Sequence, residues 1–156
     1  MNREPRVWMV FSCLVALFLS VLPLPHWLEI VRPAFLVLAV LYFSITAPRA
    51  GGIGLGFFAG LAIDVFQGSV LGQHALALAL VAYIVVREHQ IIRSKPALQQ
   101  SLIVFFALLA YEFVSFAIDG WTGHPITNPL RWVHTLTGAI IWPLAIALLE
   151  RGHSPR

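Results

Sequence analysis

The chain has 156 residues, of which 59% are hydrophobic and only 11% are charged, and its formal net charge is +3. A water-soluble domain of this length does not need so large an apolar fraction for its core. The connectors between the apolar segments are also too short to form a large soluble domain. The composition therefore predicts one integral membrane domain over residues 1–156.

Six apolar segments follow one another along the chain, at residues 7–24, 31–47, 52–68, 71–86, 98–118 and 130–149. Each has roughly 16 to 21 residues, close to the ~20 that a membrane-spanning helix needs. The second is short because Pro33 and Pro48 bracket it, and only the turn "GSVLG" separates the third from the fourth. The pattern predicts an all-α, polytopic bundle of about six transmembrane helices, with a hairpin that does not fully cross as the alternative.

Basic residues are distributed unequally between the connectors. Both termini and the second and fourth connectors hold eight of the ten: Arg3, Arg6, Arg49, Arg87, Arg93, Lys95, Arg151 and Arg156. The other connectors hold only Arg32 and Arg131. Because Lys and Arg accumulate on the cytoplasmic side, both termini are predicted to be cytoplasmic, as an even number of helices also requires. The net charge is thus a topology signal, and no basic stripe interleaved with aromatic residues indicates nucleic-acid binding.

Glycines recur every four residues in the third segment. The series comprises Gly52, Gly56 and Gly60, then Asp64, and continues with Gly68 and Gly72. On a helix this spacing forms one ridge without side chains, which lets a neighbouring backbone approach closely. We therefore expect a helix-packing ridge. Its neighbour is either another helix of this chain or a partner subunit.

Asp64 is an acid inside an apolar run, and insertion of such a group into the membrane costs about 2.5–3.5 kcal/mol, so it needs a partner. Glu112 is predicted to lie at a similar depth, near the outer ends of the helices. Arg32, Arg131 and His134 begin the second and sixth segments on that side, and the two arginines are the expected cations for Asp64. This polar cluster is either a structural knot or part of a proton relay. Few ionisable residues lie deeper in the helices, which favours the knot.

Enzyme and metal motifs are not evident in the sequence. The histidines form no pair at the three- or four-residue spacing that places two metal ligands on one helix face. "GGIGLG" opens a membrane segment, and no lysine follows it as in a phosphate-binding loop. The sequence thus predicts no catalytic residues, no bound metal and no cofactor.

Several stretches resemble the MreD family of bacterial rod shape-determining proteins. They are "RPAFLVLAVLYFSITAPRAGG", "GFFAGLAIDVFQGSVLGQHALALALVAY", "LQQSLIV" and "GAIIWP", and with the hydropathy profile they cover nearly the whole chain. The resemblance implies a non-enzymatic protein of the bacterial inner membrane. It also implies a six-helix fold similar to the substrate-binding subunits of energy-coupling-factor transporters, which by itself does not establish ligand binding.

The partners implied by the resemblance are those of the cell-wall elongation machinery. They are MreC, the MreB filament, and the peptidoglycan synthase RodA with its penicillin-binding transpeptidase, all in a setting of membrane lipids. Such a protein is a scaffold that binds MreC and helps couple MreB to peptidoglycan synthesis. The alternative is a small-ligand or lipid-binding transport subunit, which should contain a cavity lined by convergent polar groups.

Overall fold

The computed structural model describes residues 4–124 and 129–153, and every regular element in these ranges is a helix. The helices are α1 (Glu4–Val21), α2 (His26–Glu29), α3 (Phe35–Thr46), α4 (Ile53–Gln67), α5 (Gln73–Arg87), α6 (His89–Arg93), α7 (Ala97–Thr122) and α8 (Arg131–His153). The all-α prediction is thus confirmed for the described residues. Each of the six predicted segments overlaps one of the longer helices, with bounds that differ by a few residues. The short helices α2 and α6 were not predicted.

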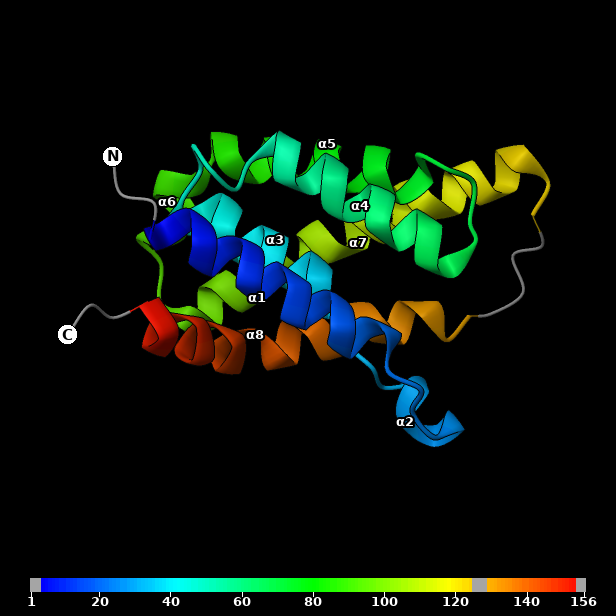
Figure 1. Cartoon of the computed structure of the whole chain (residues 1–156), viewed down its shortest axis with the longest axis horizontal. Helices are drawn as coiled ribbons and strands as arrows, with labels where there is room; N and C mark the ends of the chain where they lie inside the picture. The colour runs from blue at the N-terminus through cyan, green and yellow to red at the C-terminus, as the bar shows by residue number, and fades with distance from the viewer. Residues whose placement is uncertain (1–3, 125–128, 154–156) are drawn as a thin grey trace.

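Helix α3 is the centre of the bundle. Its ten positions from Leu36 to Ile45 are all buried, so the helix has no solvent-facing or lipid-facing side. A helix that is apolar on all sides is a core helix. Helices α1, α4, α5, α6 and α8 all contact it, while α7 packs against α5 and α8. In Figure 1, α1 crosses in front of α3, with α4 and α5 along one side and α8 along the other.

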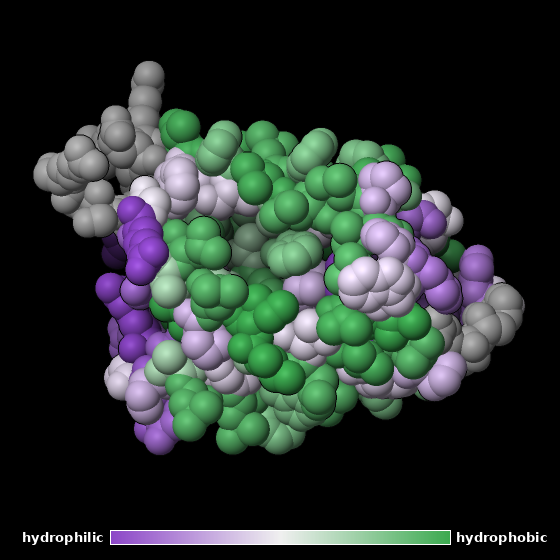
Figure 2. Space-filling model, turned by 90° about the horizontal axis from the view of Figure 1, so that it is seen from below, coloured by the Kyte–Doolittle hydropathy of each residue, from purple (hydrophilic) through white to green (hydrophobic). Residues whose placement is uncertain are grey.

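The two ends of the bundle differ in the helices and residue types that lie there. The described chain begins and finishes at the same end, where α6 also lies, and α2 projects from the opposite end (Figure 1). Figure 2 shows a face whose middle is covered mainly by hydrophobic residues, with hydrophilic residues at both ends and most strongly at the end where the described chain begins and finishes. An apolar belt with a polar end is the surface expected of a membrane bundle.

Helix length separates the six longer helices into two groups. Residues Ala97–Thr122 and Arg131–Gly152 are long and apolar enough to cross a membrane by themselves, whereas α1, α3, α4 and α5 contain shorter apolar helices. Helix α3 has 12 residues. At about 1.5 Å per residue it reaches about 18 Å of an apolar layer about 30 Å thick. The count of six membrane crossings remains a prediction.

Two helix ends differ from the predicted ones near a proline or a glycine. Helix α3 begins at Phe35, after Pro33, and not at residue 31. Helix α7 continues past residue 118 to Thr122. It ends there because Gly123 adopts a left-handed conformation, with φ 73°. This extension adds Asp119 to a helix face that points into the bundle.

Candidate functional site

The glycine ridge of α4 faces α5 of the same chain. A Cβ atom added at Gly56 would lie 3.0 Å from the carbonyl oxygen of Leu78 and 3.1 Å from the Cβ of Ala82. At Gly60 it would lie 2.5 Å from both the nitrogen of Ala75 and the carbonyl oxygen of His74. The obstructing atoms at Gly60 belong to the backbone, which cannot rotate away. The close approach of α4 and α5 therefore requires a residue without a side chain at this position.

The other three glycines lie at the ends of this helix pair. A Cβ on Gly52 would lie 3.0 Å from the carbonyl oxygen of Pro48 and 3.6 Å from Cγ2 of Val86 on α5. Gly68 and Gly72 have no atom within 4 Å of an added Cβ, and their φ angles are +65° and +98°. A residue with a side chain is strained at these angles. The structure thus places Gly68 and Gly72 in the turn between α4 and α5, outside the packing contact.

Asp64 caps the first turn of α5. Its carboxylate is 1% exposed and accepts bonds from the backbone nitrogens of Gly72 (2.9 Å) and His74 (3.0 Å). It also accepts a bond from the Ser69 hydroxyl at 2.8 Å and lies 2.7 Å from Nδ1 of the His74 ring. The first N–H groups of a helix lack partners within the helix and carry a partial positive charge. The Asp64 carboxylate accepts hydrogen bonds from these N–H groups, and its negative charge is attracted to their partial positive charge.

This arrangement differs from the predicted pairing of Asp64 with Arg32 or Arg131. Asp64 lies one turn before the end of α4, so the tight turn brings the start of α5 directly against its carboxylate. The backbone donors of that turn and the His74 ring surround the acid. The sequence does not predict the contact of His74 with Asp64, because the two residues pair across a turn and not at the three- or four-residue spacing of one helix face.

Arg131 instead joins two acids of α7. Its Nε donates to Glu112 at 3.1 Å, and its Nη1 donates to Asp119 at 2.8 Å. Asp119 also accepts a bond from the Gln73 amide at 2.6 Å, and the same amide lies 3.2 Å from the Ser115 carbonyl oxygen. The network therefore ties α5, α7 and α8 together at the end of the bundle opposite the termini.

Arg32 and His134 form a third contact. His134 Nδ1 donates to the carbonyl oxygen of Arg32, and an Arg32 guanidinium nitrogen donates to the carbonyl oxygen of Leu19. Leu19 is in the last turn of α1, where carbonyl groups lack partners within the helix. Arg32 Nε is buried without a partner among the described residues. Of the five predicted cluster residues, the structure joins Arg131 with Glu112 and Arg32 with His134, and it leaves Asp64 apart from both pairs.

A cavity of ≈ 590 Å³ lies between these groups, and we call it the outer cavity. Its lining residues include Arg32, Gln73, His74, Tyr111 and Arg131. The His74 and Tyr111 rings are in contact, with centroids 5.9 Å apart. Most polar groups on its walls already pair with one another. Within the described residues, no group of three or more side chains could hold a metal ion.

Comparison with known proteins identifies the family. The family model described as rod shape-determining protein MreD matches residues 2–151. The chain belongs to the MreD family. The rod shape-determining protein MreD of Haemophilus influenzae is 30% identical over 140 residues, which cover 88% of this chain and 85% of that relative. No solved structure matches the chain. Membership in the MreD family confirms the resemblance seen in the sequence and makes the chain a non-enzymatic, rod shape-determining membrane protein.

Proposed function

We propose that this MreD-family chain is a membrane scaffold that binds MreC through an exposed helix face. In this role it helps couple MreB filaments to peptidoglycan synthesis by RodA and its penicillin-binding transpeptidase. The family assignment supports the setting. One feature of the structure, the outer face of α1, supports the mode of binding.

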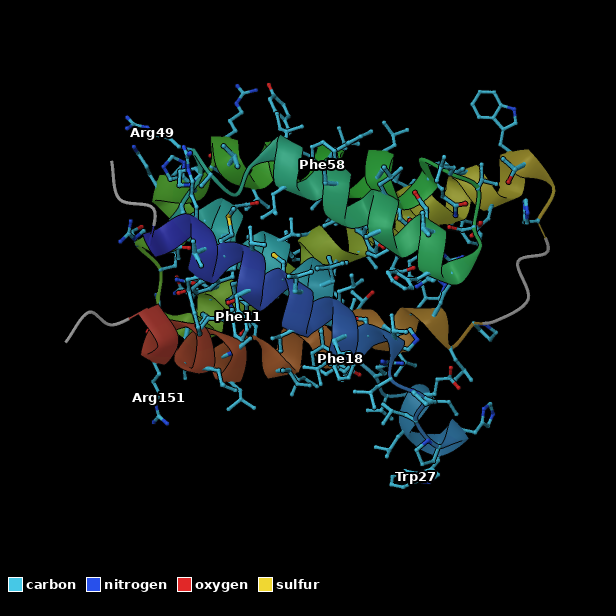
Figure 3. All side chains as sticks on the ribbon, in the orientation of Figure 1. Phe11, Phe18, Trp27, Arg49, Phe58 and Arg151 are labelled. Carbon is cyan, nitrogen blue, oxygen red and sulfur yellow. The ribbon has the colours of Figure 1, made fainter. Side chains whose placement is uncertain are left out.

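The four most exposed large apolar residues of α1 form a regular series. Val7, Phe11, Leu14 and Phe18 are 66%, 56%, 59% and 68% exposed, and their spacing is four, three and four residues. This alternation is the seam along which one helix packs against another at a small crossing angle. Figure 3 labels Phe11 and Phe18 on α1, the helix that lies in front of α3 in this view. A single membrane helix, such as that of MreC, fits this seam.

The interior of the bundle offers no comparable site. The glycine ridge is covered by α5, and α3 is enclosed on all sides. The connectors between the described helices are short, so little folded surface remains outside the apolar belt. A partner must therefore meet the outer faces of the helices or the ends of the bundle.

The same reasoning supports an inner-membrane location with both termini in the cytoplasm. Arg49 and Arg151 lie at the end of the bundle that holds both termini, while Trp27 lies at the other end (Figure 3). A cytoplasmic position for the basic end follows the usual distribution of Lys and Arg. MreB would then meet the basic end, and the outer cavity would open toward the periplasm.

Co-purification of MreC from detergent tests the seam. The variant Phe11→Ala/Phe18→Ala removes two rings from α1, and the matched control Phe106→Ala/Phe113→Ala removes two rings from α7 with the same spacing and exposures of 59% and 62%. If the two rings together contribute about 2 kcal/mol, retained MreC falls about 30-fold in the first variant. Equal retention by both variants would remove α1 as the binding face.

The outer cavity favours a second candidate, a small-ligand or lipid-binding transport subunit. Its volume of ≈ 590 Å³ lies in the range of ligand sites. Because most of its polar groups are already paired, the scaffold explains the site better. Gln67, an exposed residue on the cavity wall, allows a test by Gln67→Trp, which adds a bulky ring at this wall. The scaffold role predicts normal rod shape and normal MreC retention, whereas a ligand-dependent role predicts loss of rod shape with MreC still bound.

A further inference from the structure

A second cavity, of ≈ 530 Å³, has Arg93 of α6 in its wall. Helix α6 lies at the end of the bundle where the described chain begins and finishes (Figure 1). We call this second cavity the inner cavity. Its walls come from α3, α6, α7 and α8, and they include Tyr42, Phe43, Arg93, Trp142, Ile146 and Glu150. It shares no lining residue with the outer cavity. None of the networks around Asp64 or Arg131 reaches it, so those networks do not account for it.

Trp142 lines the inner cavity, and its indole N–H is an unused hydrogen-bond donor. Trp142 is 1% exposed, and its Nε1 is buried without a partner among the described residues. Buried N–H groups nearly always have an acceptor, because leaving one unpaired is destabilising. A ligand that places an oxygen atom in the inner cavity would supply this acceptor.

Two opposite charges stand at the rim of the inner cavity. Arg93 comes from α6 and Glu150 from α8, and both side chains are exposed. In the part of the chain that the structure describes, neither side chain takes part in an ion pair. Oxygen-bearing phosphate groups are good partners for an arginine, and an ammonium group is a good partner for a carboxylate. The rim therefore matches a head group that carries one charge of each sign.

The position of the rim corresponds to the depth of lipid head groups. Helix α6 carries Arg93 near Arg87 and Lys95, at the bundle end where hydrophilic residues gather beside the apolar belt (Figure 2). Basic side chains at this point of a membrane protein lie among phosphate groups. Below the rim, Phe43 and Ile146 give the wall an apolar part suited to acyl chains.

We propose that the inner cavity binds one molecule of a zwitterionic phospholipid, phosphatidylethanolamine. Its phosphate lies against Arg93, its ammonium group against Glu150, and an ester carbonyl oxygen accepts the Trp142 N–H. An anionic lipid such as phosphatidylglycerol keeps the contact with Arg93 but leaves Glu150 facing an uncompensated negative charge. The site is therefore selective for the zwitterion. This lipid site goes beyond the scaffold role and does not depend on it.

Native mass spectrometry of the full-length protein tests the proposal. The protein is purified in mild detergent and mixed with equal amounts of phosphatidylethanolamine and phosphatidylglycerol. We expect retained phosphatidylethanolamine to exceed phosphatidylglycerol about fivefold, and we expect Trp142→Phe and Arg93→Gln each to lower its retention by a similar factor. Glu150→Gln should abolish the preference by bringing the two lipids to equal retention. The controls Trp121→Phe and Arg87→Gln change exposed residues that do not line the cavity and should leave retention unchanged.

Three results would overturn the proposal. Equal retention of the two lipids by the unmodified protein refutes the selectivity, and absence of both lipids refutes binding. Equal losses in cavity variants and controls show that the lipid is held by the general apolar surface. Trp142 is a large buried side chain, so the exposed residues Arg93 and Glu150 keep the test decisive if Trp142→Phe fails to fold.

Discussion

Replacement of Asp64 tests the capping role of this buried carboxylate. In Asp64→Ala, the backbone N–H groups of Gly72 and His74 lose their acceptor, as does the Ser69 hydroxyl. Loss of a helix N-cap costs about 1 kcal/mol, and leaving further buried donors unpaired adds about 1–3 kcal/mol. We expect a total loss of about 3 kcal/mol in the free energy of unfolding.

The structure also predicts how well an asparagine amide can replace the Asp64 carboxylate. Oδ1 serves Ser69 and His74, whereas Oδ2 serves Gly72. Asp64→Asn keeps one of these oxygens and loses the charge, so we expect a smaller loss of about 1 kcal/mol. Thermal unfolding in detergent measures both variants, with midpoint decreases of about 6–12 °C for alanine and about 2–4 °C for asparagine. Gln67→Ala, which changes an exposed residue one turn away, is the control and should stay within about 0.5 kcal/mol of the unmodified protein.

A double-mutant cycle identifies the partner of Asp64. Because His74 lies 2.7 Å from the carboxylate, Asp64→Ala and His74→Ala together should cost less than the sum of the single changes. Arg32→Ala, at a residue bonded elsewhere, should add its full effect. The capping explanation fails if the alanine and asparagine variants are as stable as the unmodified protein. If both also retain MreC yet lose rod shape, the carboxylate has an active role instead.

Two further predictions concern packing and topology. Gly60→Ala should lower the free energy of unfolding by about 1–3 kcal/mol, because its Cβ would meet the backbone of α5. On the same helix, Gly54→Ala meets no atom within 4 Å and should be neutral or slightly stabilising in the same unfolding assay. Equal effects of the two changes would contradict the ridge. Reporter fusions after Glu29, Gly68 and Trp121 should give a periplasmic signal, and fusions after Arg49, Lys95 and Arg156 a cytoplasmic one. A cytoplasmic signal at Gly68 would replace the six-span arrangement by a hairpin that enters and leaves on one side.

The positions of the six longer helices and the packing face of α4 could be anticipated from the sequence because they depend on local patterns. Apolar runs predict where helices form, and the four-residue glycine spacing predicts which face of α4 lacks side chains. The same spacing does not distinguish a helix contact from a turn. Gly68 and Gly72 continue the series, yet their positive φ angles serve the turn between α4 and α5. The end of α4 separates the packing glycines from the turn glycines. Tertiary contacts as well as sequence determine where this helix ends.

The polar contacts could be predicted less well, because they depend on which backbone groups lie within reach. Depth and charge predict arginine partners for Asp64, although its donors are the backbone N–H groups at the start of α5. A segment predicted to end at residue 118 places Asp119 in a connector, so the sequence does not predict its contact with Arg131. Arg32 turns toward the unpaired carbonyl of Leu19 at the end of α1. Matching side chains by charge and depth neglects these helix ends, which compete for every buried polar group.

The positions of these contacts explain why a partner helix is expected on the outside of α1. Helices α4 and α5 are held together along their length by the glycine ridge and at the turn by Asp64. Arg131 then ties α8 to α7, and Gln73 ties α5 to the same acid. Insertion of a foreign helix between these elements would break backbone-to-backbone packing and buried polar bonds at once. Helix α1, by contrast, carries the exposed series Val7, Phe11, Leu14 and Phe18. A partner can pack there without disturbing any of these contacts.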